Sequence, residues 1–256
     1  MTSLWPRIEP LLARVQKPAR YIGCEDGSRA PAHSAGKVAW LLLYPDAYEV
    51  GLPNQGLQIL YEILNERDDA VAERSYAPWG DMEGQLRARG LPLFSVESHR
   101  PAALFDVLAF NLSSELVYTN VLNCVDLAGL EVRSARRRPG DPLVIAGGHA
   151  TFNPEPMADF VDAFVIGDGE EVVSELNSVL ASWRRAGGRD DRASATSRSA
   201  VLRELAMVPG VYVPAMYDVA YDGPRVAAVT PRFAGVPAVV EKRTITDLGA
   251  LSLIHI

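Results

Sequence analysis

Glycines and hydroxyl side chains gather in four short segments, each of which follows an apolar run. These segments are YPDAYEVGLPNQG (44–56), NLSSELVYTN (111–120), AGGHATFNPEP (146–156) and IGDGEE (166–171). A glycine lacks a Cβ atom, so its backbone can turn sharply and can approach a ligand closely. Hydroxyl groups and open main-chain N–H groups form hydrogen bonds with a ligand. The pattern therefore predicts a binding site.

The candidate contact residues come from all four segments. They are Tyr48, Ser113, Ser114, Thr119, Gly147, Gly148, Thr151, Gly167, Gly169 and Glu170. Glu170 and its neighbour Glu171 would start a helix, where a carboxylate meets the positive end of the helix dipole. For any single glycine, a tight strand-to-helix turn without a ligand is the alternative. Four such segments at one edge of a sheet favour a site.

Motifs for catalysis, metal binding and nucleotide binding are missing from the sequence. Cys24 and Cys124 are too far apart for a CxxC or CxxxCxxC motif, and the four histidines form no HExxH pair. No GxSxG, GxGxxG or GxxxxGK[ST] pattern follows a strand candidate. We therefore assign no catalytic residue and no metal ligand, and expect neither NAD nor ATP.

The composition describes a globular protein with one main domain. Of the 256 residues, 48% are hydrophobic and 22% are charged. The net charge of -7 argues against a nucleic-acid groove, which needs concentrated lysine and arginine. The basic run RSARRRPG (133–140) is interpreted as a solvated helix end and loop. No apolar run could span a membrane and the N-terminus lacks a signal sequence, so we expect a cytoplasmic protein without membrane contact.

Strand and helix candidates alternate along the chain, which predicts an α/β fold with a doubly wound parallel sheet. The predicted strands are 38–45, 70–78, 92–98, 107–113, 142–148 and 162–168. The predicted helices are 56–67, 81–90, 119–130, a short helix after Pro154, and 170–187. Ligands of such sheets bind beyond the carboxyl ends of the strands, where the four glycine- and hydroxyl-bearing segments lie.

The remaining parts of the chain suggest extensions of this α/β unit. Residues 1–37 are expected to form an N-terminal helical extension and 38–187 the α/β domain. Residues 188–205 are expected to form a flexible insertion and a helix, because the stretch 184–200 reads as a solvated, mobile linker. Residues 206–250 are expected to form a β-rich linker with a small β-hairpin, whose turn lies around Asp222 and Gly223.

Four blocks of the sequence carry a family resemblance. They are LLLYPDAYEVGLPNQGLQILYEILN, ERSYAPWGDMEGQLRARGLPLFSVES, FDVLAFNLSSELVYTNVLNCVDLAGL and PLVIAGGHATFNPEPMADFVDAFVIGDGEEVV. Together they resemble the Rossmann-like, cobalamin-binding-type N-terminal domain of a family of radical SAM proteins. The resemblance implies a bound corrinoid (cobalamin). It also implies a barrel, in cis, that binds a 4Fe–4S cluster through CxxxCxxC and cleaves S-adenosylmethionine.

The sequence departs from this family pattern in one decisive way. No CxxxCxxC is present, so we expect a fragment that lacks the barrel and has no radical SAM activity alone. Its last six residues, LSLIHI (251–256), match the translation of a transposase adapter used in sequencing libraries, and are expected to be foreign to the protein. The DxHxxG motif that supplies the cobalt ligand in methionine-synthase-like domains is also missing. His149, on a later loop, is expected to be a partly exposed turn histidine.

The resemblance implies that the strand-end glycines contact a corrin or its nucleotide tail. Three functions stay open at this stage. The chain could be a fragment of a cobalamin-dependent radical SAM enzyme, a stand-alone corrinoid-binding module, or a structural domain for interdomain contacts. The substrate of the parent enzyme is not encoded in these residues.

Overall fold

The sheet at the centre of the molecule has six strands in the order β2-β1-β3-β4-β5-β6. The computed structural model describes residues 3–187 and 195–246. The strands are β1 (Val38–Tyr44), β2 (Ala70–Tyr76), β3 (Val107–Asn111), β4 (Leu143–Gly147), β5 (Ala163–Val165) and β6 (Val211–Tyr212). Strands β1 to β5 pair in parallel, and β6 pairs antiparallel with β5. The predicted fold class is confirmed. The chain changes direction between β1 and β3, and ligands bind at such switch points.

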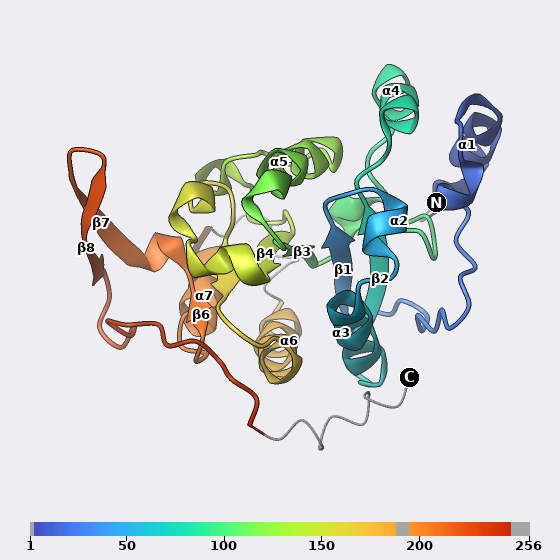
Figure 1. Cartoon of the computed structure of the whole chain (residues 1–256). Coiled ribbons are helices and arrows are strands. Elements are labelled where there is room, and N and C mark those ends of the chain that lie inside the picture. Colours follow the sequence, from blue (N-terminus) through green and yellow to red (C-terminus); the bar gives the residue numbers. More distant parts are fainter. Residues whose placement is uncertain (1–2, 188–194, 247–256) are drawn as a thin grey trace.

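Helices cover both faces of this sheet (Figure 1). The α-helices of the domain are α2 (Tyr48–Gly51), α3 (Gln55–Asn65), α4 (Gly80–Ala88), α5 (Tyr118–Leu127), α6 (Glu170–Arg185) and α7 (Ala195–Leu205). Helices α3 and α6 lie on the face opposite to α5 (Figure 1). Asn54 caps α3, because its side-chain oxygen accepts a hydrogen bond from the Leu57 N–H at 2.9 Å. Leu57, Tyr61 and Leu64 then face the core.

The strand β1 is buried along its whole length, as its continuous apolar run predicts. Its Trp40 donates a hydrogen bond from Nε1 to Asn177 Oδ1 of α6 at 2.8 Å. The Asn177 side-chain amide in turn donates to Asp69 at 2.9 Å. This chain of hydrogen bonds ties α6 to the sheet on the same side as α3.

Two sequence predictions of secondary structure are wrong. Residues 92–98 form no sheet strand; Val96 N–H donates to Arg74 O at 2.9 Å, so this loop covers the outer edge of β2. The short helix predicted after Pro154 is present as a 3-10 helix, Glu155–Met157. Val211 and Tyr212 join the main sheet as β6 although they were expected in the linker.

Two basic segments that were expected to be solvated contain buried arginines. The Arg137 side chain is 0% exposed, and its Nη1 lies 2.7 Å from Asp162 Oδ2. Arg198, from the stretch expected to be a mobile linker, places Nη2 2.9 Å from the same oxygen. These predictions failed because charge runs are usually solvated, whereas here one buried carboxylate pairs with both cations.

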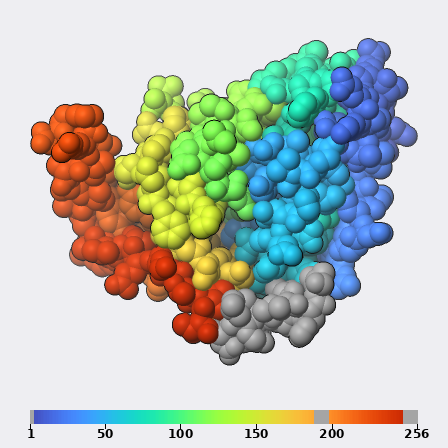
Figure 2. Space-filling model, in the orientation of Figure 1, coloured from blue at the N-terminus to red at the C-terminus, as the bar shows by residue number. Residues whose placement is uncertain are grey.

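The predicted hairpin is confirmed as β7 (Tyr217–Asp222) and β8 (Arg225–Pro231). It projects from the body of the molecule (Figure 2). At the N-terminus, α1 (Trp5–Ile8) and two 3-10 turns, Glu9–Arg14 and Pro18–Tyr21, form the expected short helices. Ile8 and Leu11 pack with Met82 and Leu86 of α4 in a second, smaller core.

Parts of two predicted regions fall outside the description. Residues 188–194 of the expected insertion and the expected foreign segment 251–256 are not among the described residues. No helix in the ranges 3–187 and 195–246 combines the length and the apolar character needed to cross a membrane.

Candidate ligand-binding site

A cavity of about 260 Å³ lies between the sheet, α3 and α6, and extends to the carboxyl ends of the strands. Its walls are apolar side chains of the strands and of both helices. They are Trp40, Leu42, Leu57, Leu60, Ala109, Phe110, Ile145, Val165, Val173 and Leu176. Its rim consists of Gly56, Asn111, Gly147, Gly148, Gly167, Asp168, Gly169 and Glu170. An apolar cavity with a few polar groups at its mouth is the usual form of a small-molecule site.

Two of the rim glycines leave room for a ligand. A Cβ atom on Gly147 would lie 3.9 Å from the Val165 Cβ, and one on Gly169 would lie 3.5 Å from Leu60 Cδ2. Both distances are ordinary contacts, so packing within the chain does not require glycine at either position. Their missing side chains add instead to the open volume of the cavity.

The other two predicted rim glycines are required by the backbone itself. Gly148 has a φ of +110°, and a Cβ there would lie 2.8 Å from Leu112 O. Gly167 has a φ of +99°, and a Cβ there would lie 2.1 Å from Arg243 O. At these positions the turn alone explains the glycine.

Polar groups at the rim come from β3, from the loop before α3 and from α6. The Asn111 Nδ2 lies 3.5 Å from Asn54 Oδ1, which also caps α3. Glu170 opens α6, and its Oε2 is buried without a hydrogen-bond partner within the described chain. Buried polar atoms are normally hydrogen-bonded. Glu170 Oε2 therefore marks the place where a donor on a ligand would fit.

The remaining predicted contacts lie outside this cavity. Thr151 is 0% exposed, and its hydroxyl lies 2.7 Å from Gly148 O and 2.8 Å from Val165 O. It therefore joins the ends of β4 and β5 beneath the rim. Ser113, Ser114 and Thr119 lie in the loop and first helical turn after β3, and none of them lines the cavity.

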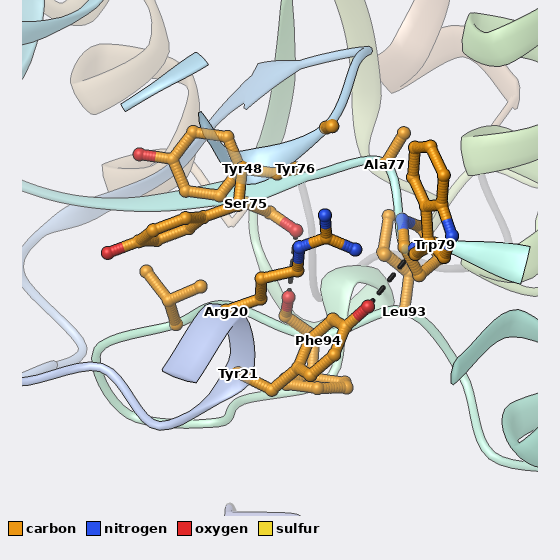
Figure 3. A pocket seen from close by; sticks show the side chains of 12 residues that line it. Arg20, Tyr21, Tyr48, Ser75, Tyr76, Ala77, Trp79, Leu93 and Phe94 are labelled. Carbon is orange, nitrogen blue, oxygen red and sulfur yellow. Dashed lines mark hydrogen bonds between the residues drawn. The ribbon is translucent and has the colours of Figure 1, made fainter. Parts of the chain in front are cut away.

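Tyr48 lines a second, much smaller cavity of about 20 Å³ (Figure 3). Tyr21, Tyr76 and Trp79 lie around it, and the Tyr21 hydroxyl accepts a hydrogen bond from the Trp79 N–H at 3.1 Å. Burial, together with the nearby Glu25 carboxylate, raises the pKa of Tyr48 to about 12. Its protonated hydroxyl donates to Glu25 Oε1 at 3.1 Å, so Tyr48 holds the N-terminal segment in place.

Exposed apolar side chains surround the carboxyl edge of the sheet. Val50, Trp79, Leu116 and Phe152 follow β1, β2, β3 and β4 respectively, and they are 50%, 50%, 89% and 56% exposed. His149 is exposed beside Phe152, as expected, with the two ring centroids 6.5 Å apart. Among the described residues, no three His, Cys, Asp or Glu side chains converge in the manner of a metal site.

A family profile described as "Radical SAM proteins, N-terminal" matches residues 56–214, which is more than half of the chain. The chain belongs to this family of radical SAM N-terminal domains. The match includes α3, β3, β4, β5 and α6, and thus every element of the cavity except β1. No curated protein matches the sequence.

Among solved structures, this radical SAM N-terminal domain is similar to a radical S-adenosylmethionine methyltransferase, TsrM, from Kitasatospora setae. That structure contains a tryptophan substrate and a SAM analog. The two sequences are 16% identical with a TM-score of 0.39, and the similarity covers 68% of this chain. The similarity covers 28% of the methyltransferase chain.

Several residues of the site were not predicted from the sequence of this radical SAM N-terminal domain. Trp40, Leu60 and Val173 are apolar residues of ordinary strand and helix patterns, and only the packing of α3 beside α6 brings them together. Asn111 and Asp168 could have been found, because each lies within a predicted strand-end segment and carries a polar side chain.

Proposed function

We propose that this chain is the corrinoid-binding N-terminal domain of a radical SAM enzyme. The observation that carries the proposal is the apolar cavity between α3 and α6, whose mouth opens at the carboxyl ends of β3, β4 and β5. Membership of the radical SAM N-terminal family supports it. In the intact protein, a following domain would supply the 4Fe–4S cluster and S-adenosylmethionine chemistry.

The residues present fit one part of a corrinoid better than the whole. The volume of about 260 Å³ lies below the range of roughly 300–1,000 Å³ that is usual for complete ligands. A flat aromatic base, such as the nucleotide tail of cobalamin, would fit between Leu60 and Val173, while the macrocycle would lie outside. The exposed Leu116 and Phe152 would then contact its apolar face.

The chain's own residues would bind and orient this cofactor. Gly147 and Gly169 leave space for the base, and Glu170 Oε2 would accept a hydrogen bond from the tail. The loop after β1 holds Asp46 and Tyr48 and no histidine, so this loop would supply no imidazole ligand to the cofactor. A bound corrinoid supplies methyl-group transfer through its cobalt, which the protein side chains do not supply.

The test is a spectroscopic titration of the 256-residue chain with hydroxocobalamin and, in parallel, with dicyanocobinamide, which lacks the nucleotide tail. We expect binding of the first and much weaker binding of the second. Equal affinity for both corrinoids would contradict a site for the tail. No binding of either would leave a structural role for the domain.

A matched pair of variants tests whether the ligand binds in the cavity. Gly147→Leu adds a side chain that points into the cavity. Ile145 and Gly147 are two residues apart in β4 and so lie on the same face of the strand, and Ile145 lines the cavity. We expect the affinity to fall about 5- to 150-fold, because overfilling a packed site costs roughly 1–3 kcal/mol. Gly84→Leu is the control: Gly84 lies exposed on α4, with no atom within 4 Å of an added Cβ. Unchanged affinity in a folded Gly147→Leu variant would contradict the site.

A further inference from the structure

The described chain returns to the cavity after the hairpin. Residues 232–246 run back beneath α7 and α6 in the view of Figure 1, and along the lower edge of the surface in Figure 2. Near its end, Arg243 pairs with Gly167 in a parallel bridge beyond β5. Gly167 is one of the rim residues, so the last described segment touches the mouth of the cavity.

Three hydrogen bonds, two of them between backbone groups, hold this segment to the rim. The Arg243 N–H donates to Ile166 O at 2.8 Å, and the Asp168 N–H donates to Arg243 O at 3.2 Å. The Ile245 N–H donates to Asp168 Oδ2 at 2.8 Å. Residues 243–245, here named the strap, therefore bind the rim loop 166–170 through its main chain and through one of its carboxylates.

Two glycines make room for Arg243. A Cβ on Gly167 would lie 2.1 Å from Arg243 O, and a Cβ on Gly210 would lie 2.4 Å from Arg243 Cγ. Both glycines have positive φ, +99° and +83°. They come from separate segments, after β5 and before β6, and both leave the space that Arg243 occupies. The position of Arg243 is thus built into the sheet and is not an incidental surface contact.

The guanidinium of Arg243 completes the attachment on α6. Its Nη2 lies 2.9 Å from Glu171 Oε2 and 2.8 Å from Glu175 Oε1. The two carboxylates are 57% and 41% exposed, so each pair is partly screened by solvent and weak by itself. An attachment of this kind holds the segment in place but can be released.

We propose that the strap couples the cavity to the polypeptide that follows residue 246 in longer family members, with Arg243 as its positioning residue. The docked strap fixes the rim loop, and the rim loop contributes Gly167, Asp168, Gly169 and Glu170 to the cavity. A ligand that binds the ordered rim therefore favours the docked strap. By thermodynamic reciprocity, a following domain that pulls the strap away from the rim lowers the affinity of the cavity for its ligand. The ligand in this proposal is that of the proposed function.

The docking of the strap is tested without any ligand, by hydrogen exchange on the 256-residue chain. In Arg243→Ala, we expect the amides of Asp168 and Ile245 to exchange roughly tenfold faster through local opening, with β1 and β3 unchanged. Lys242→Ala is the matched control, since the neighbouring Lys242 is exposed. The double variant Glu171→Gln/Glu175→Gln removes the negative charges that pair with the guanidinium, without altering the strap. Unchanged exchange in both Arg243→Ala and the double variant would overturn the proposal.

The coupling is tested with hydroxocobalamin on the same variants. We expect Arg243→Ala to bind at least about fivefold more weakly than the parent and Lys242→Ala, the lower end of typical coupling between sites. Faster exchange with unchanged affinity would overturn the coupling. If the parent chain binds no corrinoid, the proposed function fails, and the exchange data still decide whether the strap docks as described.

Discussion

Replacing Asp162 by asparagine should lower the free energy of unfolding by about 3–5 kcal/mol, the usual cost of removing one partner from a buried ion pair. Asp162 Oδ2 lies 2.7 Å from Arg137 Nη1, 2.9 Å from Arg198 Nη2 and 2.7 Å from the Val144 N–H. The Arg137 side chain is 0% exposed, so water cannot replace the lost carboxylate. The variant would leave a buried guanidinium without a counter-charge.

The assay is equilibrium unfolding in urea, with thermal unfolding alongside. About 1 kcal/mol shifts the midpoint of a domain of this size by roughly 2–4 °C, so a fall of about 6–20 °C is expected. Asp159→Asn is the matched control: Asp159 pairs with Arg133, but these side chains are 66% and 55% exposed. An exposed pair contributes about 0–1 kcal/mol. If Asp162→Asn lies within about 1 kcal/mol of Asp159→Asn, the ion pairs do not carry the stability assigned to them.

Two further predictions concern stability. Thr151→Val removes the hydroxyl beside Gly148 O and Val165 O and should lower the free energy of unfolding in urea by about 1 kcal/mol. Thr119→Val, at an exposed position, should change it by less than about 0.5 kcal/mol. Equal effects of the two variants would contradict the bridging role of Thr151. Burial raises the pKa of Glu97 to about 7. Because its folded pKa lies above the unfolded value, the contribution of Glu97 to stability should fall as pH rises from about 4.5 to about 7 and then level off. Measured against Glu97→Gln across this range, a difference that is flat or rises with pH would refute the assignment.

The fold could be predicted where one pattern dominates the local sequence. The run Val38–Tyr44 is apolar throughout and becomes the buried β1, and the spacing of Leu57, Leu60 and Leu64 gives α3. The strand β6 was missed because two residues are too few for a pattern, and their pairing with β5 is decided by the path of α7.

Buried charges set the limit of the sequence prediction. Arg137 and Arg198 stand in runs of arginine, serine and glycine that are typical of solvated loops. Their burial depends on Asp162, which is distant from both along the chain and lies next to β5. A sequence pattern predicts the usual exposure of a charged residue. A partner that is distant along the chain can bury that residue instead.

For the candidate site, the sequence indicated the edge of the sheet at which the cavity opens and several residues of its rim. Gly147, Gly148, Gly167, Gly169 and Glu170 all lie at one cavity, because parallel strands bring their carboxyl ends together. Tyr48 was placed there by the same reasoning, but α2 directs it toward the N-terminal segment and Glu25. Which strand-end side chains face a shared cavity depends on the turns of the individual loops, which the sequence did not determine.

The two edge strands of the sheet are protected from pairing with another chain, whereas the carboxyl ends of the strands expose apolar side chains. On one side, residues 94–98 cover β2, with Arg74 bound to Glu97 at 2.7 Å; on the other, β6 is only two residues long. Covered and very short edge strands do not serve as templates for a neighbouring chain. The domain can therefore expose Leu116, Phe152 and the other apolar side chains at the ends of its strands without favouring strand pairing between molecules, which leads to aggregates or fibres.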